Sequence, residues 1–262
     1  MEPAPGCSQV SVRADPLPIV GVELGSRMEN TALSVTERAY VPTGEVFTMV
    51  HRHHPSFNSA FATTRDFTGA RPRFEAREKV TAQYRVRHLE RRKPPVLYRG
   101  VAERTAQLVK AVGKCVVAVD ITRTGRPVYG LVMKAIRDAL EGTDIRVTPS
   151  PVTVTGIAGG VSHGPDAGWL VPRRDLVSAA LLLFEADQLK IAEGLELAST
   201  LTEEFVNFKL KEDPKADLEG WQLAKNDDLV LAVAMSVWAA ERFLRKEESV
   251  PAGSLGIPRA AG

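Results

Sequence analysis

Hydrophobic residues in the first half of the chain form short runs separated by polar residues. Four of these runs have the alternation or continuity of β-strands, and they cover 18–25, 30–41, 81–92 and 115–121. The last run, CVVAVDI, is almost continuously apolar, which is typical of a strand that is covered on both faces. Weaker strand patterns follow at 144–156 and 189–192. The chain is therefore expected to contain a partly buried β-sheet.

Helical spacing of apolar residues begins after these first strands. It predicts helices over 98–113, 127–142, 173–188, 194–210 and 226–243. Pro127 and Gly142 are typical of the start and the end of a helix. Strands that come first and then alternate with helices predict an α/β fold, in which helices cover a sheet.

Three segments lack a regular pattern. Residues 1–17 are rich in proline and 247–262 in Gly, Pro and Ala, so both are expected to be flexible ends of one domain over 18–246. Residues 42–79 have no clear period, which predicts an irregular insertion or a mobile binding loop. The HRHH tract at 51–54 lies in this segment, and with no cysteine nearby it indicates a solvated basic loop rather than a metal site.

Composition adds a few exclusions. The chain has 262 residues, 44% hydrophobic and 25% charged, as expected of a globular protein. Its net charge of +2 does not by itself indicate a polyanionic partner. Cys7 and Cys115 are far apart, which argues against a disulfide framework and favours a reducing compartment. No apolar run reaches the roughly 20 residues that span a bilayer, so no membrane partner is expected.

Four carboxylates lie at the ends of predicted elements. Glu23 interrupts the first apolar strand, Asp120 closes another, and Asp227 and Asp228 precede the last helix. A charge at a buried strand end is unfavourable unless it is paired or binds a metal, so a salt bridge to an arginine is the simple alternative for Glu23 and Asp120. Helix capping is the simple alternative for the aspartates, although one acid is enough for a cap. Carboxylates that converge at one end of a sheet could instead hold one or two Mg²⁺ or Mn²⁺ ions.

Several of these segments resemble, in the same order, the C-terminal nuclease domain of the large terminase subunit of tailed phages. The stretch IVGVELGSRMENTALSVTER resembles a Gly-x-Asp-x-Gly motif that leads to Thr-Ala and an apolar strand. The stretch VVAVDITRTGRPVYGLV resembles the Val-Asp-x-Thr-x-x-Gly-x-Pro-Val block of the family. YRVRHLER fits the strand between them, the region from GWLVPRRDL to FVNFKL matches its helical part, and NDDLVLAVAMSVW matches its closing acidic helix.

The resemblance implies a ribonuclease H-like fold, with a mixed sheet of about five strands and helices on both faces. The first three strands would form an antiparallel meander, with Glu23 and Asp120 on neighbouring parallel strands. It implies a metal-dependent DNA endonuclease that hydrolyses phosphodiesters, with two Mg²⁺ or Mn²⁺ ions held by Glu23, Asp120 and Asp228. The resemblance also places Asp227, adjacent to Asp228, among the metal-binding and catalytic residues, with Asp228 as the preferred third ligand.

The implied substrate is double-stranded DNA, and the implied location is the cytoplasm of a bacterial host, as a phage or prophage product. No GxxxxGK[ST] phosphate loop occurs in the chain, so a packaging ATPase would be a separate partner, as would a portal. DNA contacts are expected from Arg85 and Arg87 on one face of a strand and from Arg123 and Arg126 in the turn after Asp120. A charged edge strand and an ordinary turn are the alternatives for these two pairs.

The chain departs from the family at two positions. Glu23 stands where the family usually has Asp, and Asn226 stands where a His commonly precedes the acidic pair. Asn226 cannot act as a general base. Two other functions therefore remain open. One is a non-catalytic DNA-binding or assembly module that kept the nuclease fold, and the other is a nuclease resembling the Holliday-junction resolvases.

Overall fold

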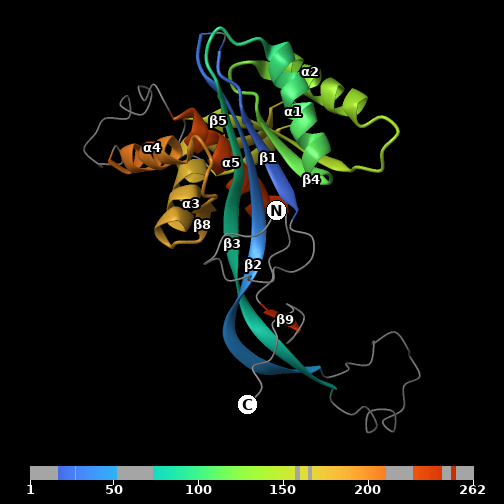
Figure 1. The fold of residues 1–262 in the computed structure, drawn as a ribbon, viewed down its shortest axis with the longest axis vertical. Coiled ribbons are helices and arrows are strands. Elements are labelled where there is room, and N and C mark those ends of the chain that lie inside the picture. Colours follow the sequence, from blue (N-terminus) through green and yellow to red (C-terminus); the bar gives the residue numbers. More distant parts are fainter. Residues whose placement is uncertain are drawn as a thin grey trace. The chain divides into compact units, whose positions relative to one another are not determined.

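The computed structural model describes residues 17–26, 28–51, 73–156, 160–164, 167–210, 227–243 and 249–251. Its strands are β1 Pro18–Glu23, β2 Thr31–His51, β3 Arg73–Arg92, β4 Cys115–Asp120, β5 Val147–Thr155, β6 Ser162–Gly164, β7 Gly168–Pro172, β8 Leu189–Ile191 and β9 Ser249–Pro251. They form one sheet in the order β6-β7-β5-β4-β1-β2-β3-β8, and β9 pairs with β3 (Figure 1).

The centre of the sheet has the strand directions that the sequence predicted. Strand β1 is antiparallel to β2 and parallel to β4, which in turn is parallel to β5. Glu37 lies beside Arg87 and Thr43 beside Lys79, so β2 and β3 run in opposite directions. The ribonuclease H-like fold class is thereby confirmed. The described sheet has nine strands rather than about five, because short strands extend its edges.

Helices cover both faces of this sheet. They are α1 Tyr98–Val112, α2 Gly125–Ala139, α3 Arg173–Glu185, α4 Ala198–Leu210 and α5 Asp228–Phe243. Figure 1 shows α1 and α2 together on one face, with α3 and α5 on the other. Among the helices of the described chain, none is both long enough and apolar enough to cross a membrane.

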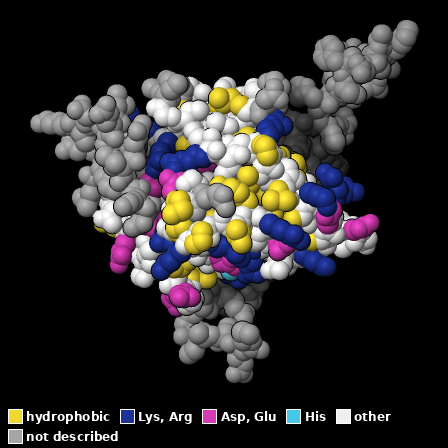
Figure 2. Space-filling model, turned by 90° about the horizontal axis from the view of Figure 1, so that it is seen from above, with side chains coloured by type: hydrophobic (Ala, Val, Ile, Leu, Met, Phe, Trp, Pro, Cys, Tyr) yellow, Lys and Arg dark blue, Asp and Glu magenta, His cyan; other side chains and the backbone are white. Residues whose placement is uncertain are grey.

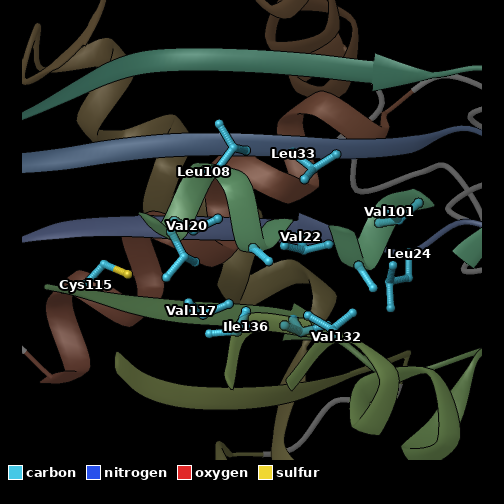
Figure 3. Packing of buried hydrophobic residues seen from close by; sticks show 14 of the residues in the cluster. Val20, Val22, Leu24, Leu33, Val101, Leu108, Cys115, Val117, Val132 and Ile136 are labelled. Atoms are coloured by element: carbon cyan, nitrogen blue, oxygen red, sulfur yellow. The ribbon is translucent and has the colours of Figure 1, made fainter. Parts of the chain in front are cut away.

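The face under α1 and α2 carries the main hydrophobic core. Val20 of β1 and Val117 of β4 point toward Val101 of α1 and Ile136 of α2, and all four are fully or almost fully buried (Figure 3). Full burial of a side chain of this size stabilises the fold by about 1.5–3 kcal/mol. The alternation along β1 thus fixes which residues face the core and directs Glu23 away from it at the strand end.

The opposite face of β1 packs closely against α5. A Cβ atom on Gly21 would overlap the Ala232 carbonyl oxygen and the Ser236 hydroxyl, so only glycine allows the helix to lie this close. The Ser34 hydroxyl of β2 donates a hydrogen bond to the Ala232 carbonyl oxygen at 2.9 Å. Every residue from Asp228 to Ala240 is buried, which explains why this helix is apolar on all sides.

The prediction of an irregular segment over 42–79 is wrong at both ends. Strand β2 continues to His51 and β3 already begins at Arg73. The backbone here is paired, and the Thr43 hydroxyl donates to the Lys79 carbonyl oxygen at 3.1 Å. Residues 43–48 are exposed, so neither face of this part of β2 is buried and no alternating pattern marks the strand. Residues 52–72, with most of the HRHH tract, lie outside the described residues, as do 1–16 and 252–262.

Contacts divide the chain into two compact units. Of the described residues, one unit contains 40–51, 73–82 and 249–251. It contains the outer parts of β2 and β3, and β9 pairs antiparallel with β3 through Lys79 and Ser249. In it, Val80 packs against Tyr40. The other unit consists of residues 15–39 and 83–245, and it contains all five helices and all the acids discussed below.

Candidate metal centre

Glu23 and Asp120 end two neighbouring parallel strands. Val22 of β1 is paired with Val119 of β4, so the next residue of each strand is one of the two acids. Neighbouring strands lie about 4.8 Å apart, and parallel strands bring their carboxyl ends to the same edge. The structure thus confirms the predicted placement of Glu23 and Asp120 at the centre of the sheet.

Asp120 is held in one orientation by Thr122. The Thr122 backbone N–H donates to Asp120 Oδ1 at 2.8 Å, and the Thr122 hydroxyl binds the same oxygen. The hydroxyl oxygen also accepts the Val154 N–H of β5 at 2.7 Å. Asp120 is only 6% exposed, and burial raises its pKa, against the lowering effect of the Thr122 hydrogen bonds and of Arg123 and Arg173. Asp120 is therefore fixed in position and lacks a neutralising ion pair within the described chain.

Glu23 is the acid with the least compensation. Its Oε2 atom is buried and has no hydrogen-bond partner among the described residues. Burial raises the pKa of Glu23 well above its ordinary value, and the negative charges of Asp120, Asp228 and Asp227 raise it further, while Arg123 lowers it. Glu23 is therefore close enough to each of the other three predicted acids to be repelled by its charge.

Asp227 and Asp228 form salt bridges to arginines. The Asp228 Oδ2 atom accepts from Arg91 Nε at 2.7 Å, and its Oδ1 atom accepts from the Asn30 side-chain amide at 3.3 Å. Asp227 pairs with Arg173 of α3. Burial raises the pKa of Asp227, and Arg173 opposes that increase. The salt bridges that the sequence suggested for Glu23 and Asp120 are thus found at the two aspartates.

Glu204 of α4 satisfies the first turn of α5. The Asp227 carbonyl accepts the Leu231 N–H at 3.0 Å, so Asp227 is the backbone N-cap. The nearby Val230 N–H donates at 3.2 Å to Glu204 Oε2, and the other oxygen of Glu204 binds Arg91. Burial raises the pKa of Glu204 to about 7. A side chain from α4 therefore caps one N–H of this first turn.

Neither Glu204 nor Arg91 is among the site residues predicted from the sequence. A signal for Glu204 is present in the sequence. Leu201 and Phe205 are fully buried, and Glu204 follows Leu201 by three positions on the same helical face. An acid on the apolar face of a helix needs a buried partner, but the sequence does not show that this partner lies on β3.

The described residues include no group of three or more His, Cys, Asp or Glu side chains that is already arranged to hold a metal ion. The reason is visible in the contacts, because Asp228 and Asp227 face arginines and Asp120 faces Thr122. The donor set nevertheless fits a hard divalent cation, which takes carboxylate oxygens. The unpartnered buried oxygen of Glu23 is the observation that favours such an ion.

The four arginines predicted to contact DNA have different surroundings. Arg85 donates to Gln83 at 2.8 Å, and Arg87 lies 3.6 Å from the Glu37 carboxylate. Arg126 is exposed in the first turn of α2. Arg123 pairs with Glu29 and also interacts electrostatically with Glu23 and Asp120. Arg123 is thus linked electrostatically to two of the acids.

Acidic and basic side chains lie next to one another on the described surface. Figure 2 shows dark-blue and magenta groups side by side at several places on the face seen from above. The described chain has exposed ion pairs of this kind, for example Arg99–Glu103 and Lys134–Asp138. Asn226, the remaining departure noted in the sequence, lies outside the described residues.

No protein-family model matches the chain, and no curated protein matches it. Nine chains of solved structures do match. The Mn-soaked human cytomegalovirus terminase nuclease domain is 16% identical, with a TM-score of 0.46, covering 84% of this chain and 82% of that one. The large terminase nuclease of the thermophilic phage G20c with bound magnesium is 16% identical, with a TM-score of 0.41, covering 87% and 84%. RuvC of Thermus thermophilus is 12% identical, with a TM-score of 0.32, covering 90% and 99%. The resemblance to terminase nuclease domains that was noted in the sequence is thus also found among solved structures.

Proposed function

We propose that this protein is a metal-dependent DNA endonuclease of the terminase large-subunit type. The observation that carries the proposal is the partnerless, buried carboxylate oxygen of Glu23, which lies among Asp120, Asp227 and Asp228. Three further acids around such an oxygen are unfavourable in the absence of a cation. Their position at the carboxyl ends of parallel strands is also where α/β sheets bind ligands.

Glu23, Asp120 and Asp228 would hold Mg²⁺ or Mn²⁺, with Asp227 beside them. Two such ions, the number that the sequence resemblance implies, would activate water and stabilise the leaving oxygen of a phosphodiester. Thr122 keeps Asp120 oriented, and α5 delivers Asp227 and Asp228 together from the other face of the sheet. Both aspartate side chains must turn away from their arginines to bind the same ion as Glu23.

Double-stranded DNA is the proposed substrate, on the basis of the sequence resemblance. Arg123 is the proposed phosphate contact nearest the acids, since its ion pair with Glu29 is exposed and a phosphate can replace it. Arg85, Arg87 and Arg126 are further proposed DNA contacts. A separate packaging ATPase or portal is the proposed partner. The protein would be a phage or prophage product in the cytoplasm of a bacterium.

Cleavage of supercoiled plasmid tests this function directly. We expect nicking with Mn²⁺ or Mg²⁺, none with EDTA, and a loss of at least about 100-fold in Glu23→Gln and Asp120→Asn. Asp138→Asn is the matched control, because Asp138 is an exposed acid paired with Lys134 on α2. Folded wild-type protein that does not nick with any divalent metal would refute the proposal, as would full activity in both acid variants.

A non-catalytic DNA-binding module is the second candidate. It is favoured by the salt bridges of Arg91 and Arg173, which neutralise two of the four acids as in a structural cluster. If this candidate is right, the protein binds DNA in EDTA and does not cleave it with any metal. Glu23→Asp is then the substitution expected to restore cleavage. A preference for four-way junctions over linear duplex would instead indicate a resolvase-like nuclease.

A further inference from the structure

One guanidinium joins two buried acids from different helices. Arg91, at the end of β3, bonds Asp228 of α5 through Nε at 2.7 Å and contacts Glu204 of α4 through Nη2. The side chains are 13%, 9% and 5% exposed for Arg91, Asp228 and Glu204. Water therefore weakens these ion pairs far less than it weakens surface pairs.

This arrangement leaves Asp228 with a cation already bound. Its Oδ2 atom is taken by Arg91 and its Oδ1 atom by Asn30. A divalent ion that binds Asp228 must compete with the guanidinium for the same carboxylate. Removing a buried cation from its partner is strongly unfavourable unless another acid receives it.

Glu204 is placed to be that second acid. It already touches Arg91, and its other oxygen is fixed by the Val230 N–H at 3.2 Å. The guanidinium can therefore release Asp228 and keep a charged partner. Glu204 itself needs no movement, since the first turn of α5 holds it in place.

We propose that Arg91 is a positioning residue that occupies Asp228 before metal binds and is retained by Glu204 when Asp228 turns to the ion. The inference rests on the proposed metal site. It assigns opposite roles to two residues of one network. Arg91 competes with the metal, whereas Glu204 assists the metal by holding Arg91.

The two roles predict changes of opposite sign. Arg91→Gln removes the competing cation, so Mn²⁺ should bind at least about fivefold more tightly. Glu204→Gln leaves Asp228 as the sole acid on Arg91, so Mn²⁺ should bind more weakly by a similar factor. A purely structural role would loosen the start of α5 in both variants and weaken binding in both.

Free Mn²⁺ measured by electron paramagnetic resonance during titration gives the dissociation constant without DNA or turnover. Arg104→Gln is the matched control, because Arg104 pairs with Glu90 and not with any of the four acids. We expect its Mn²⁺ affinity to stay within about twofold of wild type. The double variant Arg91→Gln/Glu204→Gln loses one charge of each sign and should bind Mn²⁺ as tightly as Arg91→Gln. It tests the inference if the single variant Arg91→Gln does not fold.

Unchanged or weaker Mn²⁺ binding in the folded Arg91→Gln or double variant would overturn the inference. Binding by Arg91→Gln but not by wild type would support it. An absence of binding in both would overturn it together with the proposed metal site. Opposite shifts in affinity without any plasmid nicking would support the inference and refute only the nuclease function.

Discussion

At the scale of single residues, the acids of the site differ in what compensates their charge. Asp228 and Asp227 have arginines, Asp120 has the donors of Thr122, and one oxygen of Glu23 has no partner in the described chain. Glu23 is thus the acid whose charge is most unfavourable without a cation. Its removal should therefore stabilise the metal-free protein.

Glu23→Gln should raise the melting temperature in EDTA at pH 8. The folded pKa of Glu23 lies above the ordinary value of 4.5, so the folded protein holds a proton that the unfolded chain releases. Glu23 therefore makes the folded state lose stability as the pH rises from 4.5 through its raised pKa, and Glu23→Gln lacks this contribution. Each 1 kcal/mol of difference shifts the melting temperature by about 2–4 °C.

Thermal unfolding at pH 5 and pH 8 measures this effect. The difference in melting temperature between Glu23→Gln and wild type should be large at pH 8 and small at pH 5. Glu103→Gln serves as the control, since Glu103 is an exposed acid paired with Arg99. A gap that widens toward pH 5 would show that the charge of Glu23 does not destabilise the fold.

Cys115 should be unreactive in the folded protein. It is buried at the start of β4, and burial raises the pKa of its thiol to about 12. The thiolate that attacks disulfide reagents is therefore scarce at neutral pH. Because Cys7 lies outside the described residues, the measurement uses Cys7→Ser protein. We expect reaction with a chromogenic disulfide only after denaturation, and rapid reaction of the native protein would contradict the burial.

At the scale of elements, α5 serves both the core and the site. Its first turn carries Asp228, and its middle lies against β1 at Gly21. The close approach depends on a glycine that the sequence pattern shows only as a gap in an apolar strand. Changes far from the acids can therefore displace them.

Gly21→Ala should destabilise the protein by about 1–3 kcal/mol or more, because the new methyl group overlaps the Ala232 carbonyl oxygen and approaches Ser34 Oγ at 2.8 Å. Gly130→Ala on α2 is the control, since no atom lies within 4 Å of its added Cβ. Urea unfolding of both variants gives the two free energies. A loss below about 0.5 kcal/mol in Gly21→Ala would show that α5 can shift freely.

The sequence predicted the helices and most of the buried strands, but not β7, in which three of the five residues are buried. Helix α1 and strand β4 were expected within one residue of their observed ends, because burial imposes a period on their residues. The outer part of β2 was missed because no buried face marks it, and β6 and β9 because three residues carry no period. The contact of Arg91 with Glu204 joins residues 113 positions apart, so no local pattern could reveal it.

At the scale of the whole molecule, the proposed metal should act as a stabilising ligand. A ligand that binds only the folded state at 100 times its dissociation constant adds about 2.7 kcal/mol. We therefore expect Mn²⁺ to raise the melting temperature by about 5–10 °C, given a shift of 2–4 °C per kcal/mol.

This stabilisation should be larger at pH 8 than at pH 6. Metal binding must displace the proton that the raised pKa keeps on Glu23, so the apparent affinity rises with pH. Melting curves with Mn²⁺ and with EDTA at both pH values measure the difference. An equal rise in the Glu23→Gln/Asp120→Asn double variant would assign the effect to Mn²⁺ bound elsewhere.

The convergence of acids from β1, β4 and α5 has a consequence for biosynthesis. Glu23 precedes Asp228 by 205 positions (228 minus 23) in the chain. Ribosomes add about 5–20 residues per second, so roughly 10–40 s separate the translation of the two acids. Until α5 has left the ribosome and packed against Gly21, a nascent chain lacks the part of the proposed site that Asp228 provides. A chain that is still being translated therefore cannot complete the proposed metal site, and a chain truncated before α5 would lack Asp228.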